Sequence, residues 1–277
     1  MLRIDAHQHF WKYDPVKDRW ITDEMKVLRN NFLPSDLKLI LQENKIDGCV
    51  AIQADQSEAE TDFLIACASD FDFIMGVVGW VDLQSDRLKE RLDHYSAFKK
   101  LKGFRHILQA EPQRDLMLTE KFRKGIASLS NYEFTYDILI FPDQLRFVNK
   151  LVSGFPRQKF VINHLGKPGI KSGKVEQWQK YIKEIASFEN VYCKLSGFVT
   201  EGDWYNWKDE DFHPYFDTVL NAFGTNRIMF GSDWPVCLVA ARYEEVLHVV
   251  ENYFSSFSTD EQSKIFGSNA TAFYNLD

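Results

Sequence analysis

Residues 2–11, LRIDAHQHFW, have the pattern of a first β-strand of an α/β fold. They form a short apolar run with two histidines, separated by one residue, near its end. Alternate side chains of a β-strand point to the same face. His7 and His9 are therefore expected to present two imidazoles together, within reach of one metal ion or one substrate. Such pairs also occur by chance on protein surfaces, so further residues elsewhere in the chain are needed to show that this pair marks a functional site.

Seven more β-rich runs follow the first. The expected strands are residues 2–6, 48–53, 73–80, 103–107, 134–140, 160–163, 191–195 and 227–230. Segments with helical periodicity separate them, such as the one that contains Leu145, Val148 and Leu151. Eight strand-helix alternations predict an α/β fold of the closed (β/α)8 barrel type, with a doubly wound open sheet as the alternative.

Length and composition predict a single domain, residues 1–277, since no linker rich in Pro, Gly or Ser divides the chain. The formal charge of -7 argues against a nucleic-acid partner. No apolar run approaches the roughly 20 residues that span a bilayer, and no leader pattern is present. We therefore expect a cytoplasmic protein with no membrane partner; its oligomeric state stays open, a homo-oligomer included. The four cysteines are expected to be reduced and mostly buried.

Two long connections, residues 10–33 and 197–214, follow expected strands and should lie over the carboxyl-terminal mouth of a barrel, where barrel active sites form. Their aromatic residues are Trp11, Tyr13, Trp20, Trp204, Tyr205 and Trp207. These rings would either stack on a small ring-shaped ligand or simply cap the mouth.

Polar residues also stand where the expected strands end. They are His7, His9, Gln53, Trp80, Arg105, His106, Asp137, His164, Lys194 and Asp233. A barrel gathers the carboxyl ends of its strands, so these side chains are predicted to meet. Arg105 and Lys194 would either orient a ligand or pair with a buried Asp5 or Asp137.

Several of these motifs resemble the amidohydrolase superfamily (amidohydrolase-related family 2), and within it the sugar-lactonase branch. The motifs are DAHQH at 5–9, the strand end with His164, GSDWP at 231–235, GFRH at 103–106, KLSG at 194–197 and GSNA at 267–270. The resemblance spans almost the whole chain. It implies hydrolysis of a small-molecule sugar lactone, such as L-fuconolactone or L-rhamnonolactone, to the aldonic acid.

Lactone opening requires an activated water, stabilisation of charge on the carbonyl oxygen and a proton for the departing ring oxygen. Asp233 and His164 are the candidate catalytic residues, with Asp233 activating water. His7, His9 and His164 would polarise the carbonyl directly, or would hold one divalent metal such as Zn²⁺ together with Asp233. The candidate substrate-binding residues are Arg105, His106, Lys194, Gln53 and Trp11.

This chain departs from the dinuclear members of the superfamily, which carry a bridging Lys or Glu on the fourth strand and a His on the fifth. It offers Arg105, His106 and Asp137 there, so a second metal is not expected. A metal-free reaction also remains open. The rival functions are a decarboxylase of the same superfamily and a noncatalytic small-ligand binding barrel.

Overall fold

The computed structural model describes residues 2–276 and shows a barrel of eight parallel strands within them. The strands are β1 (Ile4–Gln8), β2 (Gly48–Ile52), β3 (Ile74–Gly79), β4 (Leu101–His106), β5 (Thr135–Ile138), β6 (Phe160–Ile162), β7 (Val191–Leu195) and β8 (Ile228–Phe230). They pair in chain order, and the seam between β1 and β8 is joined by two backbone bonds, Asp233 N–H to His7 C=O (2.8 Å) and His9 N–H to Trp234 C=O (2.7 Å). The predicted (β/α)8 barrel is confirmed, and the open-sheet alternative is wrong.

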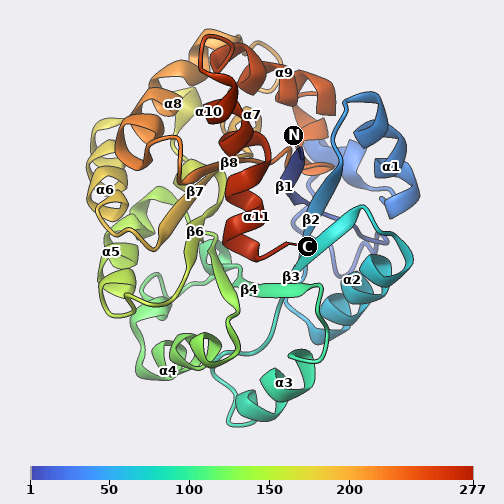
Figure 1. Cartoon of the computed structure of the whole chain (residues 1–277), viewed down its shortest axis with the longest axis vertical. Coiled ribbons are helices and arrows are strands. Elements are labelled where there is room, and N and C mark those ends of the chain that lie inside the picture. Colours follow the sequence, from blue (N-terminus) through green and yellow to red (C-terminus); the bar gives the residue numbers. More distant parts are fainter. Residues whose placement is uncertain (1, 277) are drawn as a thin grey trace.

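Helices surround the strands on the outside, as Figure 1 shows. The outer helices are α1 (Pro34–Glu43), α2 (Glu58–Asp70), α3 (Leu88–Tyr95), α4 (Glu120–Leu129), α5 (Leu145–Ser153), α6 (Glu176–Ala186), α8 (Asp209–Phe223) and α9 (Tyr243–Tyr253). Their buried side chains recur every three or four residues, as Leu145, Val148 and Leu151 do in α5, so each helix turns one apolar face to the sheet. Shorter helices are α7 (Phe198–Glu201), α10 (Thr259–Ser263) and α11 (Asn269–Tyr274).

The last helix, α11, lies across the amino-terminal end of the barrel, in the centre of Figure 1. Its Ala270, Phe273 and Tyr274 form one buried cluster with strand residues such as Ile4 and Ala6. Two lysines from β4 and the turn before β6 hold its carboxyl end by donating to main-chain carbonyls, Lys102 to Asn275 (2.7 Å) and Lys159 to Ala272 (3.1 Å). The floor of the barrel is therefore packed and closed.

The first strand begins and ends two residues later than residues 2–6. Its register against β2 shifts between Asp5 and Gln8, an irregularity that simple alternation does not foresee. Before this shift the strand alternates as expected: the Asp5 carboxylate accepts from the Ser232 N–H (2.9 Å) and Oγ (2.6 Å), while Ile4 and Ala6 belong to the apolar floor cluster. His7 and His9 both lie at the mouth of the barrel, within 3.7 Å and 3.3 Å of Asp233 Oδ1.

Three of the six aromatic residues named for the two long connections hold those connections in place. Trp11 donates its indole N–H to Asn30 C=O (3.0 Å), Trp204 to Thr200 C=O (2.8 Å) and Trp207 to Ala240 C=O (2.9 Å). For Trp204 and Trp207 these bonds favour the capping interpretation. By contrast, Tyr205 is 78% exposed.

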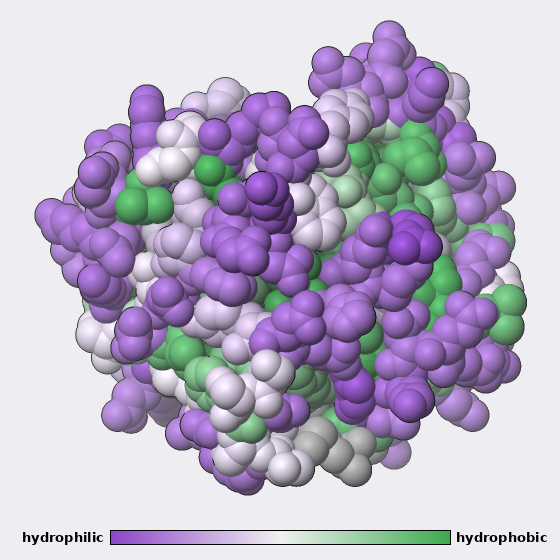
Figure 2. Space-filling view, turned by 90° about the horizontal axis from the view of Figure 1, so that it is seen from above, coloured by the Kyte–Doolittle hydropathy of each residue, from purple (hydrophilic) through white to green (hydrophobic). Residues whose placement is uncertain are grey.

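The surface over the upper helices of Figure 1 is mainly hydrophilic, with apolar side chains gathered in a few places (Figure 2). Among residues 2–276, no helix combines the length and apolar character needed to cross a membrane. All four cysteines are free and buried, as expected.

We predict that Asp5→Ala weakens the barrel at its seam. The substitution would leave the N–H groups of Ser232 and His7 buried without their charged acceptor, and we expect a loss of about 3–5 kcal/mol in the free energy of unfolding. Urea titration followed by circular dichroism measures it. Asp47→Ala removes a comparable acceptor from Arg3 N–H at an exposed position and should cost below about 1 kcal/mol. Equal losses in the two variants would contradict the role given to Asp5.

Candidate active site

Four of the side chains expected at strand ends converge at the carboxyl-terminal mouth. His7 belongs to β1, His9 follows it, His164 follows β6 and Asp233 follows β8. The Asp233 Oδ1 atom lies 3.3 Å from His9 Nε2, 3.7 Å from His7 Nε2 and 3.9 Å from His164 Nε2. All four residues are buried, so water reaches them only from the mouth.

Unusual backbone geometry turns two of these residues toward the centre. His164 (φ 55°) and Asp233 (φ 60°) both adopt the left-handed conformation that few side chains favour. Two glycines approach His164 and His7 so closely that no side chain fits between: a Cβ added to Gly197 would stand 2.4 Å from His164 Nδ1, and one added to Gly231 would stand 2.6 Å from His7 Cβ. The rings are therefore held by close backbone approach as well as by hydrogen bonds.

Each imidazole is oriented by the nitrogen that faces away from Asp233. His9 Nδ1 donates to Ile52 C=O (2.7 Å), which leaves the Nε2 lone pair directed into the site. His164 Nδ1 is 3.0 Å from Ser196 Oγ. His7 is bracketed by two basic groups, with Lys194 Nζ 3.3 Å from Nδ1 and Arg105 Nη1 3.3 Å from Nε2.

Burial sets the charges of this cluster. It lowers the pKa of His164 to about 3 and the pKa of His7 well below its usual value, so both rings are neutral near pH 7. For Asp233, burial works against ionisation, but His164 and His9 beside it lower the pKa below the usual aspartate value. The site therefore combines neutral imidazoles with one ionised carboxylate.

A second polar layer lies between this cluster and the apolar floor. Asp137 accepts from Lys194 Nζ (2.6 Å), Asn163 Nδ2 (3.0 Å) and the Tyr274 hydroxyl (2.9 Å). Burial lowers the pKa of Lys194 to about 8, although Asp137 counteracts it. Of the two alternatives for Lys194, the ion pair with Asp137 is the one seen, and the side chain is fully buried.

The other expected site residues lie at the wall of the mouth. Arg105 donates to Asn163 Oδ1 (3.2 Å) and to Gln53 C=O, and burial lowers its pKa to about 10, so it stays a cation at neutral pH. Gln53 donates to Arg105 C=O (3.1 Å) while its Oε1 has no partner among the described residues. His106 accepts from Trp80 Nε1 (3.4 Å) at Nδ1 and so donates from Nε2 to Glu111 (2.7 Å).

Sequence reasoning missed several residues that touch this site. Asn163 is the last residue of the expected strand 160–163, and its side chain donates to Asp137 (3.0 Å) beneath the cluster. Glu111 and Lys167 stand in loops, where Lys167 pairs with Glu201 (3.0 Å), and no pattern marks them. Tyr274 comes from α11, which no strand-end argument includes.

The donor set fits one divalent metal. Suitable atoms of His7, His164 and Asp233 all lie within 4.8 Å of one another, and His9 Nε2 is 3.3 Å from both His7 Nε2 and Asp233 Oδ1. A tetrahedral zinc ion with bonds of about 2.1 Å spaces its ligand atoms roughly 3.4 Å apart. Imidazole nitrogens and a carboxylate oxygen are also ligand types that zinc prefers.

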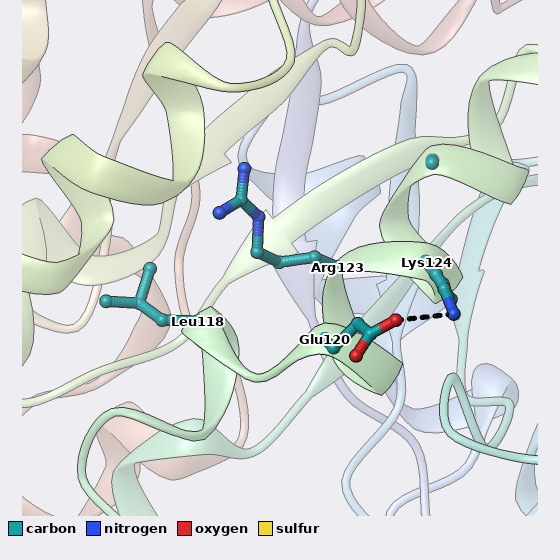
Figure 3. A pocket seen from close by; sticks show the side chains of 5 residues that line it. Leu118, Glu120, Arg123 and Lys124 are labelled. Atoms are coloured by element: carbon teal, nitrogen blue, oxygen red, sulfur yellow. Dashed lines mark ion pairs between the residues drawn. The ribbon is translucent and has the colours of Figure 1, made fainter.

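Two surface hollows lie away from this cluster. One, about 360 Å³, is formed around α4 by Leu118, Arg123 and the Glu120–Lys124 ion pair (Figure 3). The other, about 490 Å³, lies beside Tyr274 and Asn275 at the amino-terminal end. Neither gathers groups suited to catalysis, so the mouth is the candidate active site.

Comparisons with known proteins identify the family of this chain. A family model described as amidohydrolase matches residues 4–276. An L-fucono-1,5-lactonase of Burkholderia multivorans is 38% identical, over 99% of this chain and 96% of the relative. Another, of Burkholderia ambifaria, is 32% identical over 100% of this chain and 96% of the relative. A crystal structure of a Burkholderia multivorans amidohydrolase with bound zinc superimposes over 100% of both chains, with TM-score 0.96 and 38% identity.

We predict that Gly197→Ala displaces the His164 ring, whereas Gly173→Ala does not. Both glycines have a positive φ (62° and 65°), so both variants carry the same backbone penalty of about 1 kcal/mol, but a Cβ at Gly173 meets nothing within 4 Å. Crystal structures of the two variants and their urea midpoints test this. An unmoved His164 ring in Gly197→Ala would show that the close approach does not hold the ring.

Proposed function

This chain belongs to the amidohydrolase family, and from that premise we propose that it hydrolyses a sugar lactone to the corresponding aldonic acid, with L-fucono-1,5-lactone as the first candidate substrate. The observation that carries the proposal is the convergence of Asp233 Oδ1 and the imidazoles of His7, His9 and His164 at the mouth of the barrel. The similarity to two lactonases over nearly the whole chain supports the choice of substrate.

Asp233 is the proposed base. Its low pKa keeps it ionised at neutral pH, and its burial among imidazoles removes the water that would weaken it as a proton acceptor. Asp233 accepts a proton from the attacking water, and the same carboxyl then returns a proton to the ring oxygen as the carbon–oxygen bond of the lactone breaks. One group thus serves both proton transfers.

His164, with His7 and His9, is proposed to act on the carbonyl. Arg105 remains charged within 3.3 Å of His7 Nε2 and adds positive potential where the carbonyl oxygen becomes negative. Negative charge that develops there would be stabilised by groups already fixed in place.

The wall of the mouth supplies the proposed substrate contacts. Gln53 has an unpartnered buried Oε1, Arg105 has an unpartnered Nε, and a lactone with several hydroxyls offers donors and acceptors for both. His106, held by Trp80 and Glu111, would contact a further hydroxyl at the rim. Trp11 lies with its ring centroid 6.4 Å from His9 and would border the sugar ring. Lys194 acts from beneath, through His7.

We further propose that His7, His9, His164 and Asp233 hold one zinc ion. The chemistry that a metal supplies there is Lewis acidity toward water and the lactone carbonyl. The spacing of the donor atoms and the zinc in the related Burkholderia multivorans structure support the assignment. Since every part of the proposed site comes from one barrel, we also propose that the chain works as a single domain.

Asp233→Asn is expected to lower kcat on aldonolactones by about 10³-fold while the protein stays folded, because the amide has the shape of the carboxylate but accepts no proton. Acid release from a panel of L- and D-aldonolactones, read with a pH indicator, measures it. Asp260→Asn, a change at an exposed helix residue, is the matched control and should keep full activity.

Retained turnover in Asp233→Asn would remove Asp233 as the base. If the wild type releases acid from none of the lactones but releases carbon dioxide from an acidic aromatic substrate, the result would favour a decarboxylase instead.

After dialysis against zinc, the protein is expected to hold about one zinc per chain, because ligand atoms of His7, His164 and Asp233 lie within 4.8 Å of one another and His9 Nε2 lies 3.3 Å from Asp233 Oδ1. His9→Ala should lose most of this zinc, and His94→Ala, which changes an exposed histidine, should keep it. Atomic emission on desalted protein gives the stoichiometry. Turnover before and after chelation then decides whether the reaction needs the metal; zinc-free wild type under these conditions would contradict the site.

A further inference from the structure

The carboxyl-terminal helix reaches the catalytic layer through one side chain. Tyr274, the last residue of α11, directs its hydroxyl into the barrel, where it donates to Asp137 Oδ1 (2.9 Å) and lies 3.0 Å from Oδ2. Tyr274 is 1% exposed and Asp137 is 0% exposed. The contact is therefore shielded from water, which raises the cost of losing it.

The two carboxylate oxygens of Asp137 accept hydrogen bonds from different donors. Oδ2 accepts from Lys194 Nζ (2.6 Å) and Asn163 Nδ2 (3.0 Å), whereas within residues 2–276 only the Tyr274 hydroxyl donates to Oδ1. Removing this hydroxyl would leave a buried carboxylate oxygen without a donor. The carboxylate would then rotate or shift toward a new partner, and its contact with Lys194 would change with it.

Lys194 connects Asp137 to the His7 ring of the active site. Its ammonium stands 5.2 Å from the centre of the Tyr274 ring, 2.6 Å from Asp137 and 3.3 Å from His7 Nδ1, and the side chain has no exposed surface. The other nitrogen of His7 faces Arg105, which in turn donates to Asn163, another partner of Asp137. Both nitrogens of His7 therefore depend on groups that Asp137 holds.

We propose that Tyr274 is a positioning residue for the active site: through Asp137 and Lys194 it fixes the His7 ring, so that α11 contributes to lactone hydrolysis from the opposite end of the barrel. The catalytic part of this inference rests on the proposed function, whereas the placement of His7 does not. A helix that merely plugged the floor would need only the apolar contacts of Ala270 and Phe273.

The test is Tyr274→Phe, which keeps the ring and removes the hydroxyl. We expect kcat to fall on the order of tenfold and KM to stay within about twofold, because a displaced His7 affects chemistry more than binding. In ¹⁵N-histidine-labelled protein the ring signals of His7, assigned by their loss in His7→Gln, should shift. Tyr132→Phe is the matched control: its hydroxyl donates to Asp93 (2.5 Å) at the surface, and neither kcat nor the His7 signals should change.

A lower melting temperature in Tyr274→Phe, with unchanged His7 signals and unchanged kcat, would overturn the proposal. Tyr274 would then contribute to stability alone. If the wild type hydrolyses no lactone, the proposed function fails, and the His7 signals alone decide the positioning role. Should Tyr274→Phe not fold, Asp137→Asn is expected to shift the His7 signals, and their constancy in that variant would overturn the proposal.

Discussion

Closure of the barrel between β1 and β8 is the constraint on which the candidate site depends. Asp5 accepts from both the backbone and the side chain of Ser232, and the backbone bonds of His7 and His9 cross the same seam. These contacts join the first ten residues of the chain to residues more than 220 positions later. Asp233 can meet the two histidines only because this seam is closed.

The protonation states of the site residues follow from their burial in the barrel. Buried imidazoles lose their protons because water no longer stabilises the cation, and a buried carboxylate keeps its charge only beside groups that favour it. His164 and Asp233 illustrate both effects within 3.9 Å of each other. Beneath them, the pair of Lys194 and Asp137 places a positive and a negative charge in the barrel interior, where each depends on the other. The site is thus arranged as layers: an apolar floor, a paired ionic layer and a reactive layer open to the mouth.

Much of this arrangement could be predicted from particular residues. The alternation of apolar runs with helical segments predicted the barrel, since parallel strands buried on both faces need continuous apolar stretches. Strand-end positions then predicted that His7, His9, His164 and Asp233 would lie near one another, because a barrel collects those ends. The boundaries of β1 were less predictable, because the register shift between Asp5 and Gln8 arises from pairing with β2 and not from local sequence.

Local pattern and residue type were enough to predict the fold class, the chemistry-bearing residues and the family resemblance. Which of these groups touch depends on long-range packing and could be seen only in the folded chain. The sequence left open whether Lys194 pairs with Asp5 or Asp137, and the fold pairs it with Asp137 beneath His7. Tyr274 carried no signal at all, since a helix that crosses the floor of a barrel brings its side chain to the site by long-range packing, and contacts between residues 137 positions apart leave no local pattern.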